Sequence, residues 1–227
     1  MLLAGIGARG LLCAWHWRAS WWFNRTSHYG MKLPMPPTFL PRDAEIRAAL
    51  KSWLAATAGP DDYLMEELGL ERGQARVDLA VVNGSISGYE IKSDYDSVRR
   101  LPSQARRYAK VLDQATLVAS PHKLASAREL VPAWWGLIAV TAHGGTVRFK
   151  QIRRARQNPS KDLRVIVELL WQKEALDLLE QHGLAIGIRS MSRSTAWDRI
   201  VKHLDVELVE RVVRNRLKAR ARPASLP

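Results

Sequence analysis

The chain of 227 residues is long enough for one large domain, or for a domain with a small appendage. Its 35 Lys and Arg residues outnumber 22 Asp and Glu residues, and the resulting net charge of +13 favours a polyanionic partner such as DNA. The single cysteine, Cys13, excludes an intramolecular disulfide and a zinc site built on several thiolates. No apolar run is long enough to cross a membrane, and the N-terminus lacks the charge pattern of a secretory signal, so we expect a cytoplasmic protein.

The N-terminal half is predicted to begin with a leader and to continue as a helix and a hairpin. Residues 1–35 hold four of the nine tryptophans without a clean period, which indicates a leader or a disordered segment. Apolar positions recur at three and four residues from Arg42 to Ala56, as in an amphipathic helix. A second short helix is expected over Tyr63–Leu68, and then two strands, Val77–Val82 and Ile86–Ile91, joined by the turn Asn83-Gly84-Ser85.

The rest of the chain is predicted to alternate helices with strands and to end in helices. The expected elements are a helix within Ser97–Asp113 that becomes regular at Leu101, a strand Ala115–Ala119, a helix His122–Leu130, and a hairpin Leu137–Thr141 with Thr146–Ile152. Three helices follow, over Leu163–His182, Trp197–Leu204 and Glu207–Ala219. The sequence therefore predicts an α/β domain over residues 36–158, a basic helical extension over 159–222 and a disordered tail over 223–227.

The register of the two strands decides whether the charged residues of the first hairpin lie on the same face of the sheet. Side chains alternate between the faces of a strand, so Glu90 and Lys92 share one face. A three-residue turn, Asn83-Gly84-Ser85, places Asp78 opposite Glu90, whereas a two-residue turn pairs Asp78 with Tyr89 on the wrong face. We expect the three-residue turn.

Three carboxylates and a lysine then make a candidate metal centre. Carboxylate oxygens are preferred ligands of Mg²⁺, and Asp78 and Glu90 on neighbouring strands would hold Mg²⁺ or Mn²⁺ together with Glu67, or alternatively Glu66, at the end of the short helix. Lys92 would orient and activate an attacking water. The alternative is an ordinary hairpin with exposed charges.

The order of these residues resembles the PD-(D/E)XK nuclease superfamily. Asp78, Glu90 and Lys92 match its hairpin motif, and Gln104 and Tyr108, one helical turn apart, match the Q-x-x-x-Y motif of its RecB-like branch. Residues 42–220 also resemble a family of uncharacterised bacterial proteins placed in this superfamily. The resemblance implies a restriction-endonuclease-like mixed sheet flanked by helices. It also implies metal ligation by Asp78 and Glu90, a catalytic Lys92, and positioning by Gln104 and Tyr108.

The predicted function is a Mg²⁺-dependent endonuclease that hydrolyses DNA, and two alternatives remain. One is a non-catalytic nucleic-acid-binding protein with the same fold, and the other is an interaction protein in which the hairpin charges are structural. Four arginines lie beside the site in the sequence: Arg99, Arg100, Arg106 and Arg107. They are expected to contact DNA phosphates; the alternative is that they form a solvated helix face. A homodimer would suit double-strand cutting by a single site.

Overall fold

The structure, a computed structural model, describes residues 41–184, 186–187 and 191–221. The predicted leader 1–35 and tail 223–227 lie outside these residues. One sheet of six strands forms the centre, in the order β1-β2-β3-β4-β5-β6. The strands are β1 Tyr63–Leu70, β2 Ala75–Val82, β3 Ile86–Lys92, β4 Gln114–Ala119, β5 Gly136–His143 and β6 Thr146–Arg153. β3, β4 and β5 run parallel and the other neighbours pair antiparallel, so the prediction of an α/β fold with a mixed sheet is confirmed.

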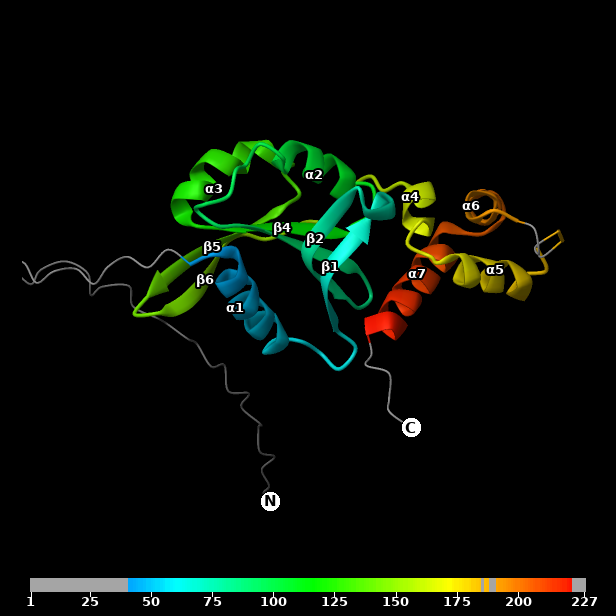
Figure 1. Ribbon diagram of the computed structural model, residues 1–227, viewed down its shortest axis with the longest axis horizontal. Helices are drawn as coiled ribbons and strands as arrows, with labels where there is room; N and C mark the ends of the chain where they lie inside the picture. Colours follow the sequence, from blue (N-terminus) through cyan, green and yellow to red (C-terminus); the bar gives the residue numbers. More distant parts are fainter. Residues whose placement is uncertain (1–40, 185, 188–190, 222–227) are drawn as a thin grey trace, which may run out of the picture. The chain divides into compact units, whose positions relative to one another are not determined.

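Helices cover both faces of the sheet (Figure 1). On one face lies α1, whose Ile46, Leu50 and Leu54 pack on a small apolar cluster. On the other face, α2, α3 and the C-terminal helices share a larger core that includes Tyr108 and Trp135. The helices are α1 Asp43–Ala55, α2 Leu101–Tyr108, α3 Pro121–Ala127, α4 Leu163–Val167, α5 Gln172–Gln181, α6 Arg193–His203 and α7 Val206–Ala221, with 3-10 turns at Glu71–Gly73 and Arg128–Leu130.

The β2–β3 hairpin has the expected three-residue turn. Val82 pairs with Ile86, and Leu79 pairs with Tyr89. Within the turn, the Asn83 N–H donates to the Ser85 carbonyl at 3.0 Å, and the Asn83 side chain accepts from the Ser85 N–H at 2.9 Å. The side chain thus supplies a hydrogen bond that a tighter turn would have made with backbone alone. The predicted register is confirmed.

Residues 63–68 form a strand, and the prediction of a helix there is wrong. β1 pairs antiparallel with β2 along its length, from Tyr63 opposite Val82 to Leu70 opposite Ala75. Just before β1, Asp62 accepts hydrogen bonds from the Gly59 N–H and the Asn83 side chain. The free backbone groups of β2 make pairing more favourable than the weak helical preference of this segment.

The predicted helix over 163–182 is also wrong in one respect, because it is divided into α4 and α5. The break falls over Glu168–Trp171. α7 packs against α4 and β1, and its buried Val209, Val213 and Leu217 belong to the same core as the sheet. The C-terminal helices are therefore part of the packed molecule. No helix in the described ranges is both long and apolar enough to cross a membrane.

Candidate functional site

Glu90 stands at the centre of a buried polar network. Its carboxylate, on β3, is only 1% exposed and forms an ion pair with Lys92, which is itself 6% exposed. From α2, the Gln104 side-chain amide donates to Oε1 at 2.6 Å, and the Tyr108 hydroxyl donates to Oε2 at 2.5 Å. Burial and the negative charge of Glu90 raise the pKa of Tyr108 above its ordinary value. Both oxygens of Glu90 are thus engaged by side chains of the protein.

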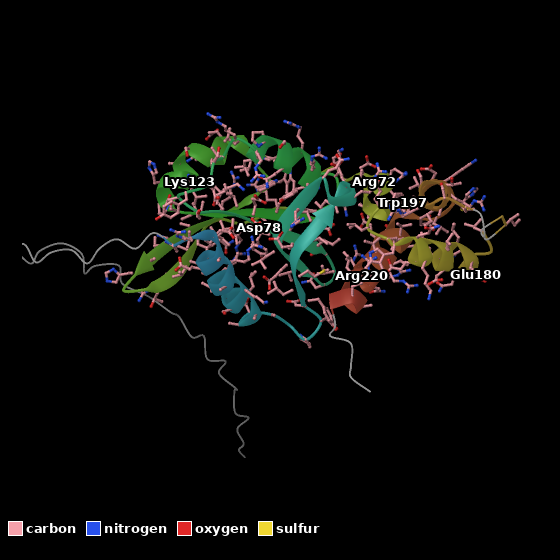
Figure 2. All side chains as sticks on the ribbon, in the orientation of Figure 1. Arg72, Asp78, Lys123, Glu180, Trp197 and Arg220 are labelled. Carbon is pink, nitrogen blue, oxygen red and sulfur yellow. The ribbon has the colours of Figure 1, made fainter. Side chains whose placement is uncertain are left out.

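Asp78 lies next to this network, at the point where β2 and β3 separate. Strand pairing ends at Leu79 and Tyr89, and beyond it the Ile91 backbone N–H donates to Oδ2 of Asp78 at 2.7 Å. Figure 2 marks Asp78 within the sheet. Burial, followed by the charge of Glu90, raises the pKa of Asp78 to about 7, against the lowering effect of its Ile91 hydrogen bond. The charge of Glu90 is therefore close enough to disfavour ionisation of Asp78.

Arg47 of α1 joins Asp78 to Glu67. Its guanidinium lies 3.2 Å from Asp78 and 3.0 Å from Asp43, and it also pairs with Glu67. Burial alone would lower the pKa of Arg47, but the hydrogen bond with Glu67 and the charges of Asp43 and Asp78 raise it above its ordinary value. The same hydrogen bond is the main cause of a lowered pKa at Glu67. A fixed positive charge thus occupies the space between two predicted metal ligands.

The two candidate acids on β1 point to different partners. Glu66 pairs with Lys51 on α1, whereas Glu67 pairs with Arg47 and, at 3.2 Å, with Arg76. Glu67 has a left-handed backbone, with φ of 55°. This conformation interrupts the strand, since Glu66 and Leu68 pair with β2 but Glu67 does not. The structure therefore brings Glu67 toward Asp78 through Arg47 and leaves Glu66 apart.

A polar cleft of about 430 Å³ opens over Asp78, Glu90 and Lys92. It lies between the start of α1, the β2–β3 hairpin and the first turns of α2. Basic side chains reach it from both sides, among them Arg76, Arg100 and Arg107. Anions and polar ligands are the chemical class that fits such a lining.

The carboxylates in this arrangement do not fit the predicted Mg²⁺ or Mn²⁺. In the ranges that the structure covers, no group of three or more His, Cys, Asp or Glu side chains is placed to hold a metal ion. The reason is visible in the contacts: Glu67 and Asp78 share Arg47, and Glu90 is engaged by Lys92, Gln104 and Tyr108. Hard cations need free carboxylate oxygens, and here protein cations already neutralise them.

The arginines predicted to contact DNA fall into two groups. Arg99, Arg100 and Arg106 are exposed and form no ion pair with a described residue. Arg107 is half-buried and pairs with Glu71, and it also donates to the Gln74 side chain at 2.8 Å. Arg107 therefore has a structural role in holding α2 to the 3-10 turn before β2.

The comparisons with known proteins identify the family. Residues 39–226 match the family model described as bacteriophage P4 protein cII. The chain belongs to the bacteriophage P4 protein cII family. Protein cII of Enterobacteria phage P4 is 31% identical over 144 residues, which make up 63% of this chain and 54% of that protein. The chain thus spans about half the length of this curated relative of the cII family. No solved structure matches the chain.

Membership of the cII family shows that the nuclease prediction is wrong. Both matches are to protein cII, and neither is to the PD-(D/E)XK superfamily, its RecB-like branch or a bacterial nuclease-like family. The predicted function, a Mg²⁺-dependent hydrolase that cuts DNA, rested on that resemblance and is therefore also wrong. The motifs misled because E-x-K and Q-x-x-x-Y are short. In this chain they build a buried ion pair in which Gln104 and Tyr108 of α2 hydrogen-bond the Glu90 carboxylate.

Two features of the charge distribution were missed by the sequence reasoning. The first is Arg47. The sequence pattern of its helix indicates only an apolar face, and no local pattern pairs Arg47 with residues 67 and 78. The second feature is a run of cations from Arg148 to Arg156. Its signal was available, because no acidic residue occurs between Glu129 and Asp162.

Proposed function

We propose that the chain binds DNA through a basic strip on β6 and the segment after it, residues 148–156, here called the β6 strip. The observation that carries this proposal is the strip's unpaired charge. Five cations occur within its nine residues: Arg148, Lys150, Arg153, Arg154 and Arg156. All but Arg153 are exposed, and none of the five forms an ion pair with a residue that the structure describes.

Like charges at this spacing repel one another unless an anion lies between them. The pKa of Arg153 is lowered, first by burial and then by the positive charges of Arg128 and Arg156. Its guanidinium is held in place by the Trp135 carbonyl, at 2.7 Å. DNA phosphates would neutralise such a row and release counterions, which supports DNA as the partner.

β6 is one of the two edge strands of the sheet, and this position supports a rival explanation. Cations on an edge strand discourage pairing with a second chain. On that view, removing the charges causes self-association and leaves DNA binding unchanged. A second candidate surface is formed by the exposed Arg99 and Arg100, just before α2, and Arg106 in its last turn, beside the polar cleft.

Two charge-matched variants separate these explanations. The first is Arg148→Ala/Lys150→Ala/Arg154→Ala, and the second is Arg99→Ala/Arg100→Ala/Arg106→Ala. Each removes three positive charges, so a general loss of charge affects both alike. We expect the first variant to bind a short DNA duplex on the order of 100-fold more weakly than the unaltered chain at physiological salt, and the second to bind nearly as well.

Fluorescence anisotropy with a labelled duplex measures the affinities, and light scattering measures self-association. Equal, strong binding by all three proteins would refute the DNA proposal for the β6 strip. Loss of DNA affinity in the second variant alone would indicate that DNA contacts the surface beside the cleft and not the β6 strip. Self-association of the first variant with unchanged affinity would support the edge-protection role instead.

A homodimer and a cytoplasmic location stay predictions. Light scattering on the unaltered chain, with and without duplex, gives the number of copies in the complex. A dimer would present two copies of the β6 strip and increase the apparent affinity for a long duplex relative to a short one.

A further inference from the structure

A small hollow opens beside the β6 strip, between the C-terminal half of α1 and the sheet. Its volume is about 230 Å³. Residues from four elements contribute side chains to its wall: Trp53, Ser87, Tyr89, Gln114, Thr116 and Gln151. Arg153 and Arg154 of the strip lie at the same hollow. Two cations of the strip therefore lie at the rim of the hollow.

Polar groups in this wall lack partners within the described part of the chain. The side chains of Gln114, Gln151 and Thr116 form no hydrogen bond with a described residue, although Thr116 is only 8% exposed. The same is true of the Tyr89 hydroxyl. The hollow thus presents polar groups that are free to hydrogen-bond a guest molecule.

Trp53 gives the hollow a flat aromatic wall. The residue is 37% exposed, unusually open for a tryptophan in a packed helix. Phe149 of β6 supports it, with ring centroids 5.6 Å apart and an angle of 37° between the planes. The support comes from the same strand that carries the cations. An exposed indole beside amides and arginines suits a nucleobase, which stacks on its face and is hydrogen-bonded at its edge.

We propose that this hollow binds one unpaired base of single-stranded DNA, an inference that rests on the DNA binding proposed above. The base stacks on Trp53, the amides of Gln114 and Gln151 hydrogen-bond its edge, and Arg154 neutralises an adjacent phosphate. A base inside a duplex has its edge occupied by its partner and its faces by its neighbours. The hollow therefore favours single strands over duplexes, whereas the β6 strip alone does not distinguish them.

The test compares two oligomers with the same number of phosphates: oligothymidylate of about 16 nucleotides and an abasic oligomer of equal length. The full chain is expected to bind oligothymidylate about 5- to 150-fold more tightly, the range for one stacked base. Trp53→Ala should lower the ratio of the two affinities to near one without changing the affinity for the abasic oligomer. Arg154→Ala should weaken both by the same factor.

Two further variants keep the test decisive. Trp171→Ala removes another exposed tryptophan, at the N-cap of α5 and outside the hollow, and should leave the ratio unchanged. Gln151→Ala removes an exposed amide without disturbing the core, so it still tests the hollow if Trp53→Ala fails to fold, and it should lower the ratio about 2- to 10-fold. Equal affinity of the unaltered chain for both oligomers overturns the base site and leaves DNA binding intact. Failure to bind either oligomer or a duplex overturns DNA binding itself.

Discussion

At the scale of single residues, the ionisation of Asp78 makes the stability of the folded chain depend on pH. Its pKa is raised from 3.8 to about 7, mainly by burial and by the charge of Glu90. Between these values the folded chain holds a proton that the unfolded chain has lost. Stability therefore falls as pH rises from about 4 to about 7, by up to about 4 kcal/mol from this group alone.

Asp78→Asn should remove this slope, because an amide cannot ionise but can still accept the hydrogen bond from Ile91. Urea unfolding at a series of pH values measures the free energy of unfolding in both proteins. We expect the variant to gain stability relative to the unaltered chain as pH rises from 4 to 7. Asp61→Asn, at an exposed carboxylate, is the control. Parallel curves for Asp78→Asn and the unaltered chain would show that Asp78 ionises normally.

The Glu90–Lys92 pair is the second prediction at this scale. Both side chains are buried, so loss of one partner leaves the other charge without compensation. Lys92→Met should lower the free energy of unfolding by about 3–5 kcal/mol. Adding Glu90→Gln to Lys92→Met should recover part of the loss, because no buried charge then remains, and Gln can still bond to Gln104 and Tyr108. A double-mutant cycle by urea unfolding measures the recovery, and strictly additive losses would contradict it.

Among the elements, the break between α4 and α5 depends on α7. Arg220 donates to the Leu169 carbonyl at 2.9 Å, pairs with Glu174, and lies 4.1 Å from the centre of the Trp171 ring (Figure 2 labels Arg220). Arg220 thereby satisfies a carbonyl that a continuous helix would have used internally. Periodicity could not reveal this break, because the stabilising side chain lies about fifty residues away along the chain.

Arg220→Ala should therefore lower the free energy of unfolding by about 2–4 kcal/mol, since Glu174 is 9% exposed and would lose its cation. Arg220→Lys should recover only part, because an ammonium cannot reproduce the forked contacts. Hydrogen exchange over residues 163–181 gives a local readout. Protection there equal to that of the unaltered chain would show that α7 does not hold the break.

Most strands of the sheet could be predicted from the sequence, but few of the ion pairs around the candidate site could be. The β2–β3 register followed from turn chemistry and face alternation, which are local rules. β1 was missed because its exposed Glu66 and Glu67 suggest a helix, and only pairing with β2 makes it a strand. The spacing correctly predicted that four side chains lie together: Glu90, Lys92, Gln104 and Tyr108. Their proximity shows that they share a hydrogen-bond network, but it does not show what that network binds or catalyses. Arg47 shows why: a distant cation decides what a group of carboxylates can bind.

At the scale of the whole molecule, many cations in the described part of the chain form ion pairs, whereas those of the β6 strip do not. Acids and bases around the cleft and the C-terminal helices neutralise one another, as Arg47, Arg107 and Arg220 illustrate. The five cations of the β6 strip have no such partners within the described residues, and they lie within nine residues of one another along the chain. Long-range attraction of DNA should therefore be directed toward this edge of the sheet.

Salt dependence tests this division of charge. If the four exposed cations of the β6 strip each contact a duplex phosphate, the slope of log K against log salt is about −3.6. Loss of Arg148, Lys150 and Arg154 should reduce its magnitude by about 2.7, whereas loss of Arg99, Arg100 and Arg106 should leave it unchanged. Anisotropy titrations at several salt concentrations give the three slopes. Equal reductions in both variants would mean that DNA responds to the total charge of the molecule and not to the strip.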